Sequence, residues 1–221
     1  ALLRPLGNGA DIVVETCKFG SNRNEPCGGA IVLGKGVDQS VRRKIRWWRS
    51  TTGSAPSNTY VQMWNCKLTT LHLRMHHVVQ KAKTLAQWME TVPCITKVVY
   101  SGLETHASYA QSMQYTGGNG AGIIMFQLPI TDRRMAFAML DNMGVICHGT
   151  WSYADCESFV TIWEMKGTAL SDQNTWFRMS VGLTPLKDIQ WSLLEGMKNA
   201  KLDTANALRM LRDNVVPFRM K

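Results

Sequence analysis

Lys18 is the residue whose setting most directly indicates chemistry. It follows the apolar run 10–14, which predicts a buried strand, and it precedes Gly28 and Gly29, which open a second apolar run at 29–33. The turn between the two runs is rich in Gly, Asn and Pro. A lysine held between two buried strands is partly desolvated, so its neutral amine can attack a carbonyl carbon and form a Schiff base. The alternative is a surface lysine on a loop, the more common state of this residue type.

The apolar pattern further along the chain predicts the elements that position such a lysine. Residues spaced by three and four predict one long helix over 58–92, which Pro93 ends. Strands and helices then alternate, which indicates a smaller α+β domain with helices on one side of its sheet. The predicted strands lie at 95–100, 122–128, 144–148 and 178–181, with a loop between the first two, and the predicted helices at 133–143, 186–198 and 202–212.

These elements divide the chain into four regions. Residues 1–57 complete a large α/β domain, and 58–92 form the connecting helix. Residues 93–199 form the α+β domain, and 200–221 form a helical, basic tail.

The composition limits the classes of protein to which the chain can belong. It has 221 residues and no apolar run long enough to cross a membrane, and no signal peptide is visible at its start. Its 6 cysteines form no CxxC pair, which favours reduced, buried thiols in the cytoplasm or an organelle matrix. His76 and His77 are adjacent and point to different faces of a helix, so we expect no metal site.

The net charge of +9 is unusual for an enzyme of small metabolites and suggests a polyanionic partner. The basic run 42–49 includes Trp47 and Trp48, which could stack on nucleic-acid bases or grip lipid. The alternative, which we favour, is an amphipathic helix whose arginines are solvated while Ile45 and Trp48 pack inward. The glycine-rich segment 117–120 resembles a phosphate-binding loop, but it is expected to be a turn before a strand.

Five segments of the chain resemble the Cys/Met-metabolism family of pyridoxal-phosphate enzymes, which includes the cystathionine lyases and synthases and methionine γ-lyase. The segments, in chain order, are 10–32 with Lys18, 69–75, 100–106, 152–158 and 178–183. The resemblance implies fold type I: the C-terminal part of a large α/β domain followed by the smaller C-terminal domain. Family members are longer, and their phosphate loop and ring-stacking tyrosine would lie upstream of this sequence.

The resemblance also implies roles for particular residues. Lys18 matches the lysine that binds pyridoxal phosphate and later takes the Cα proton of the substrate. Arg178 matches the arginine that binds the substrate carboxylate, a task suited to its planar fork of donors. Ser152 matches a serine beside the lysine and the carboxylate, and Trp151 flanks it.

The phosphate-anchoring positions depart from the family pattern. Where the family has a serine and a threonine before the lysine, this chain has Glu15 and Cys17, and it is one residue shorter there. Thr16 supplies one hydroxyl if the loop shifts, so Thr16 and Cys17 are the expected phosphate neighbours of Lys18. Glu15 near a phosphate would be repulsive.

Two functions therefore stand open at the level of sequence. The first is a pyridoxal-phosphate C–S lyase like cystathionine β-lyase, because the 159–178 segment is short and Trp151 and Tyr153 flank Ser152. It would need an N-terminal half from another chain or segment, and the family implies tetramers of paired dimers. The second is an inactive paralogue that serves as a structural subunit of a larger assembly, such as one containing nucleic acid.

Overall fold

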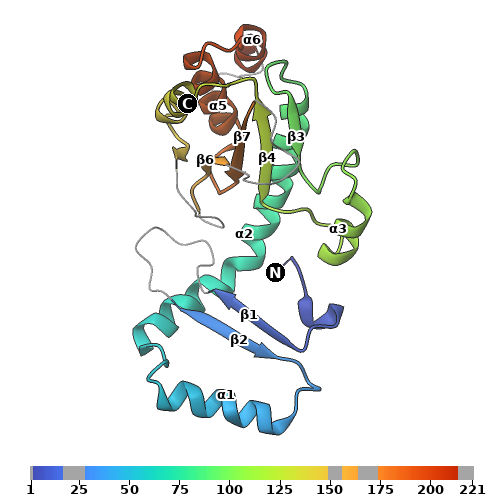
Figure 1. Ribbon diagram of the computed structural model, residues 1–221, viewed down its shortest axis with the longest axis vertical. Coiled ribbons are helices and arrows are strands. Elements are labelled where there is room, and N and C mark those ends of the chain that lie inside the picture. The colour runs from blue at the N-terminus through green and yellow to red at the C-terminus, as the bar shows by residue number, and fades with distance from the viewer. Residues whose placement is uncertain (1, 17–27, 149–155, 164–173, 214–221) are drawn as a thin grey trace, which may run out of the picture.

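Three parts follow one another along the chain: a β-hairpin with a helix, one long helix, and a five-stranded sheet covered by helices (Figure 1). The computed structural model describes residues 2–16, 28–148, 156–163 and 174–213. A short 3-10 helix, η1 (Pro5–Asn8), precedes the first strand.

The hairpin consists of strands β1 (Ile12–Thr16) and β2 (Gly29–Leu33), which pair antiparallel with Thr16 opposite Gly29. The predicted strand at 29–33 is confirmed, and the first strand begins later than predicted. The prediction that both strands are buried is wrong, because Val14 is 75% exposed and Ile31 53% exposed. The two strands form a sheet of their own, so their apolar side chains stay open in the described part of the chain.

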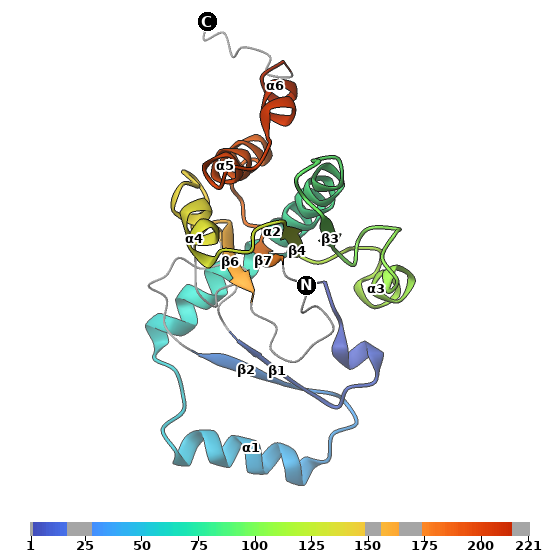
Figure 2. The same cartoon turned by 45° about the horizontal axis from the view of Figure 1, so that its top comes forward.

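Helix α1 (Gln39–Thr51) carries the basic run and lies outermost, beside the hairpin (Figures 1 and 2). The Arg42 guanidinium donates to the carbonyl oxygens of Gly34 and, at 2.9 Å, Val37, which fixes the start of the helix to the end of β2. The prediction that Trp48 packs inward is wrong: Trp47 and Trp48 are each 62% exposed, and α1 has no buried residue.

Helix α2 (Asn58–Glu90) spans 33 residues and connects the hairpin region to the sheet. The Ser57 hydroxyl caps its start by accepting from the Tyr60 amide at 3.3 Å. Trp64 is buried in its first half, where the indole ring packs against Gly28 so closely that a Cβ there would collide with it. The second half is buried along one stripe at the spacing of three and four that the sequence predicted: Val78, Val79, Ala82, Leu85, Ala86 and Met89.

The second sheet contains five strands in the order β3-β4-β7-β6-β5. All neighbours are antiparallel except β5 and β6, which are parallel. The strands are β3 (Lys97–Val99), β4 (Ile123–Leu128), β5 (Cys147–His148), β6 (Phe159–Trp163) and β7 (Thr175–Ser180). The helices that follow them are α3 (Tyr109–Thr116), α4 (Arg133–Asp141), α5 (Leu186–Asn199) and α6 (Ala205–Asp213).

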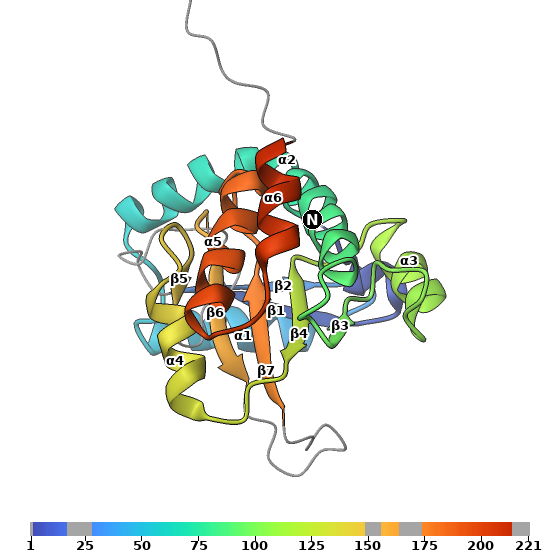
Figure 3. The ribbon, with the colours of Figure 1, turned by 90° about the horizontal axis from the view of Figure 1, so that it is seen from above.

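Helices cover one face of this sheet, as the order of predicted elements indicated. Helices α4 and α5 and the second half of α2 lie over that face in Figure 3, and their apolar residues form one core with the strands. Phe126 of β4 and Phe177 of β7 lie opposite each other at its centre, with ring centroids 5.3 Å apart. The opposite face of the sheet is turned toward the hairpin (Figure 2).

Besides the short η1, two described elements were not predicted from the sequence. Helix α3 lies in a segment that was expected to be a loop. The sequence shows no sign of a helix there, because its eight residues are mostly polar and half-exposed and show no strong apolar stripe. Strand β6 alternates only weakly, since residues on both of its faces are at least half-buried. The segment 117–120 is the turn that was expected: Gly117 ends α3 in the left-handed conformation, with φ 65°.

Tyr100 closes the connection between β3 and β4. Its hydroxyl donates to the carbonyl oxygen of Ala121 at 2.9 Å, and a Cβ on Gly102 or Gly120 would collide with its ring. Burial raises the pKa of the Tyr100 phenol to about 12. The two glycines are therefore fixed by the close approach of the ring.

Replacing Tyr100 by phenylalanine is expected to lower the free energy of unfolding at pH 8 by about 1–2 kcal/mol, because the Ala121 carbonyl loses its buried donor. Since the folded-state pKa lies above the unfolded value of 10.0, the contribution is complete below pH 10.0 and is lost as the pH rises toward about 12. Denaturant unfolding at pH 8 and pH 11 measures both effects. The matched control is Tyr115→Phe at an exposed tyrosine, and an equal loss in both variants would contradict the account.

Candidate functional site

Arg178 lies on the face of the five-stranded sheet that α4 and α5 do not cover, here called the helix-free face. Alternation along β7 places Phe177 and Met179 in the core, and therefore Arg178 on the opposite side. The register sets Met125 and Thr161 beside it on the neighbouring strands. The other residues of this face are Lys97, Val99, Ile123, Gln127, Phe159, Trp163, Trp176 and Ser180.

The Arg178 side chain is nearly buried, at 7% exposed, and its guanidinium carbon lies 5.2 Å from the ring centroid of Trp163. A cation this close to an indole ring is attracted by it, and the N–H donors of a guanidinium lie in one plane at fixed positions, which matches the shape of a planar anion. An arginine buried to this degree is not the ordinary surface charge that its residue type suggests. The geometry therefore fits the recognition of a carboxylate.

The other polar groups on the helix-free face also suit an anion. The Trp176 indole N–H lies two residues before Arg178 on the same face, is buried, and has no hydrogen-bond partner among the described residues. The strand residues that the structure places on this face include Lys97 and Gln127 but no carboxylate. A set of donors without a competing carboxylate favours the binding of an anionic group.

The end of β1 presents the residues expected to lie near a cofactor phosphate. Because side chains alternate along a strand, Thr16 and Glu15 point to opposite faces of the hairpin. The Thr16 hydroxyl can therefore meet a phosphate on one face while the Glu15 carboxylate remains on the other. The donors present, Thr16 and Arg178, fit the phosphate and carboxylate groups of a pyridoxal-phosphate site.

Four of the predicted site residues lie outside the described residues: Cys17, Lys18, Trp151 and Ser152. The segment that follows Ser152 is described from Cys156 onward, and it packs against the turn after β7, where the Leu183 amide donates to the Cys156 carbonyl oxygen at 2.5 Å. The end of the serine segment is thus held next to the strand that carries Arg178.

Two residues that the sequence did not single out contact Arg178 or the turn after its strand. Trp163 was not singled out, because its position opposite Trp176 follows only from the strand register. Lys81 falls within the predicted long helix, but its side chain is nearly buried and bonds the turn after β7. The sequence did contain a sign of the role of Lys81, because a lysine stands there among the apolar residues of the α2 stripe.

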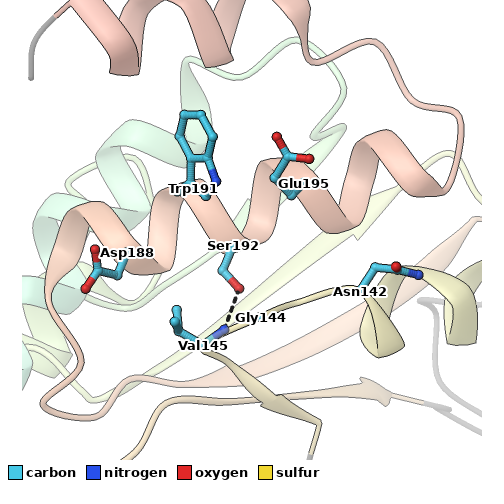
Figure 4. Close-up of a pocket in the computed structure, with 7 residues that line it drawn as sticks. All are labelled: Asn142, Gly144, Val145, Asp188, Trp191, Ser192 and Glu195. Carbon is cyan, nitrogen blue, oxygen red and sulfur yellow. Dashed lines mark hydrogen bonds between the residues drawn. The ribbon is translucent and has the colours of Figure 1, made fainter.

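A separate hollow of about 290 Å³ lies on the helix-covered side of the sheet, between α5 and the chain leading into β5 (Figure 4). Trp191 lies between the carboxylates of Asp188 and Glu195 along α5, and the Ser192 hydroxyl accepts from the Val145 amide at 3.3 Å. Its acidic groups and its place across the sheet separate it from Arg178.

The described residues contain no group of three or more His, Cys, Asp or Glu residues that could hold a metal ion. None of the helices in the described ranges is both long and apolar enough to cross a membrane.

The chain is similar in sequence to curated proteins. Human cystathionine gamma-lyase is 26% identical over 208 residues, which is 89% of this chain and 50% of that protein. Cystathionine beta-lyase of Coxiella burnetii is 25% identical over 203 residues, 86% of this chain and 50% of that protein. The chain thus spans about half the length of the curated relatives it matches.

The fold matches solved structures as well. A methionine gamma lyase from Micromonospora echinospora superposes with a TM-score of 0.74 at 24% identity, covering 89% of this chain and 51% of that one. The expected fold class, mixed α/β of the fold-type-I lyases, is therefore confirmed. The profile of the Cys/Met metabolism PLP-dependent enzymes matches residues 1–198. The chain belongs to the Cys/Met metabolism family of pyridoxal-phosphate-dependent enzymes and corresponds to its C-terminal half.

Proposed function

We propose that this chain provides the substrate-binding arginine and the cofactor-binding lysine of a pyridoxal-phosphate-dependent lyase that cleaves a carbon–sulfur bond in a sulfur amino acid. The observation that carries the proposal is the nearly buried Arg178, stacked on Trp163 on a face that lacks carboxylates among its described strand residues. The family membership and the named relatives supply the reaction class.

Each residue has a distinct task in this proposal. Arg178 binds the α-carboxylate of the substrate by two parallel N–H···O bonds, which orients the Cα–H bond. Lys18 anchors the cofactor, and its amine, once released, takes the proton from Cα. When bound, pyridoxal phosphate supplies the electron sink for that carbon. In this proposal Thr16 and Cys17 would bind the cofactor phosphate, and Ser152 and Trp151 would contact the substrate carboxylate.

We assign the β-lyase branch from the sequence around Ser152. The flanking aromatic residues Trp151 and Tyr153 and the short 159–178 segment favour it over the γ-lyases. Elimination at the β-carbon of cystathionine releases homocysteine, pyruvate and ammonia with the addition of one water. Elimination at the γ-carbon instead releases cysteine, 2-oxobutyrate and ammonia.

Incubation of the intact protein with cystathionine is therefore expected to yield pyruvate and homocysteine in equal amounts. Chromatography of the derivatised keto acids, together with a thiol assay, separates the two routes. A product mixture dominated by 2-oxobutyrate and cysteine would keep the lyase and overturn the β assignment. The absence of both keto acids, with pyridoxal phosphate in excess, would overturn the whole proposal.

We infer that the complete site also includes residues from an N-terminal half of the family fold. Support comes from the open apolar side chains of the hairpin and of α1, notably Val14, Ile31, Trp47 and Trp48. Exposed apolar residues in this number mark a surface that another unit covers. Members of the family would place such units in a homo-oligomer of paired dimers.

A second candidate function rests on α1 alone. Its exposed tryptophans and its cluster of Arg43, Lys44, Arg46 and Arg49 favour a structural subunit that binds a polyanion such as nucleic acid. The nearly buried Arg178 favours the enzyme.

Either function is compatible with a reducing compartment, the cytoplasm or an organelle matrix. The free thiols of Cys66 and Cys94 support this location. The expectation that the thiols are buried is wrong for Cys66, which is exposed.

A further inference from the structure

Lys81 is a nearly buried lysine, at 7% exposed, on the stripe of α2 that packs against the sheet. Its Nζ donates to the carbonyl oxygen of Gly182 at 3.1 Å and to that of Thr184 at 2.6 Å. Burial lowers the pKa of the ammonium. Two convergent carbonyl dipoles are a suitable partner for a buried cation, because they supply acceptors without requiring a second charge.

The turn that Lys81 bonds also holds the segment leading from Ser152. The Gly182 amide donates to the Ser158 hydroxyl at 3.0 Å, and the Ser158 amide donates to the Thr184 hydroxyl at 3.3 Å. The backbone of Glu157 lies so close to Gly182 that a Cβ there would collide with it. The segment 156–158 and the turn 182–184 are therefore locked together.

Both locked segments lead directly to residues of the proposed site. The turn begins just beyond Ser180, the end of the strand that carries Arg178, and segment 156–158 comes just after Ser152 in the sequence. The three donors of an ammonium allow one side chain to hold both carbonyls at once. Lys83, two residues along the same helix, has no such bond among the described residues, so it offers a matched comparison.

We propose that Lys81 is a positioning residue: by fixing the 182–184 turn to α2, it holds the Arg178 strand and segment 156–158 in the arrangement that binds the substrate carboxylate. The proposal rests on the proposed function for its link to substrate. The clamp itself rests on the two hydrogen bonds of Nζ and on the bonds between the two segments. Lys81 touches neither substrate nor cofactor in this account.

The test compares Lys81→Met with Lys83→Met in the intact protein, using two readouts. In hydrogen exchange, Lys81→Met is expected to speed exchange about tenfold or more in peptides covering 156–163 and 175–186, and Lys83→Met to leave both unchanged. In kinetics with cystathionine, Lys81→Met is expected to raise KM about tenfold while kcat per bound cofactor changes little, because the Arg178 guanidinium that binds the substrate carboxylate is displaced. Lys81→Arg, which keeps donors at this position, is expected to recover part of both effects.

The outcomes separate the clamp from the proposed function. Unchanged exchange in Lys81→Met would overturn the inference whether or not the protein is a lyase. Faster exchange with an unchanged KM, or a loss seen only as fewer folded molecules, would overturn the positioning role. A wild-type protein without lyase activity would overturn the proposed function and the positioning role together, while the exchange comparison would still decide the clamp.

Discussion

Replacing Lys18 by alanine is expected to lower kcat of the lyase reaction by about 10³-fold or more. The amine both anchors the cofactor and takes the Cα proton, and general base catalysis by itself contributes about 10²–10⁴-fold. Substrate binding should change little, because Arg178 and the helix-free face remain. Steady-state kinetics of the intact protein with cystathionine, at saturating pyridoxal phosphate, measures the effect.

Lys35→Ala is the matched control for this experiment. Lys35 is an exposed lysine just after β2, in the same region of the chain, and the account gives its side chain no task. It should therefore retain wild-type kcat and KM. An equally active Lys18→Ala variant would contradict the role of Lys18, and the sequence resemblance around it would then reflect ancestry alone.

Replacing Arg178 by lysine is expected to lower kcat/KM for cystathionine by about 10–100-fold, mainly through KM. Charge-assisted hydrogen bonds contribute about 1.5–3 kcal/mol each, and lysine cannot reproduce the two parallel bonds of a guanidinium. Lysine also loses the contact between the guanidinium and Trp163, whose ring centroid lies 5.2 Å from the guanidinium carbon of Arg178. Kinetics with the intact protein, together with thermal unfolding to confirm the fold, measures the effect.

Arg209→Lys serves as the control, because Arg209 is exposed on α6 and lies outside the proposed site. A change of equal size in both variants would show that the effect does not come from binding of the substrate carboxylate by Arg178. A drop in kcat without a change in KM for Arg178→Lys would place this arginine in the chemical step instead. A Trp163→Leu variant distinguishes the stack from the charge, since it keeps the guanidinium.

Elements with a strong apolar period were predictable from the sequence. The stripe of α2 and the predicted helices near α4 and α5 coincide with observed elements, because each buries one face in a shared core. Helix α3 was not predictable in this way, since it is held by local bonds and by the left-handed Gly117 at its end rather than by burial. The length of a strand was also uncertain: the expected strand at 144–148 is confined to Cys147–His148.

Burial in the first part of the chain could not be inferred from apolar content. The run in β1 is typical of a buried strand, yet Val14 is exposed because the hairpin lacks a covering layer in the described part of the chain. The same reason explains the open Trp47 and Trp48 of α1. Apolar patterning identifies a surface that will be covered, but it cannot tell whether the covering unit belongs to the same chain.

The site was only partly accessible from the sequence. Arg178 was identified through its flanking residues, whereas its stack on Trp163 and its shared face with Trp176 depend on the register of β6 and β7. Lys81 lies far from both in sequence, and its bond to the 182–184 turn is a property of the packed helix and sheet. Long-range register and burial therefore supplied the part that residue patterns could not.

The measurement that tests the central claim most directly is an absorbance spectrum of the intact protein with pyridoxal phosphate, followed by borohydride reduction and peptide mapping. The account predicts a visible band that reduction removes, and a cofactor adduct on the peptide containing Lys18. The band and the adduct should both be absent in Lys18→Ala and present in Lys35→Ala. An intact, folded protein that gives no band with excess cofactor, or that carries the adduct on another lysine, would contradict the account.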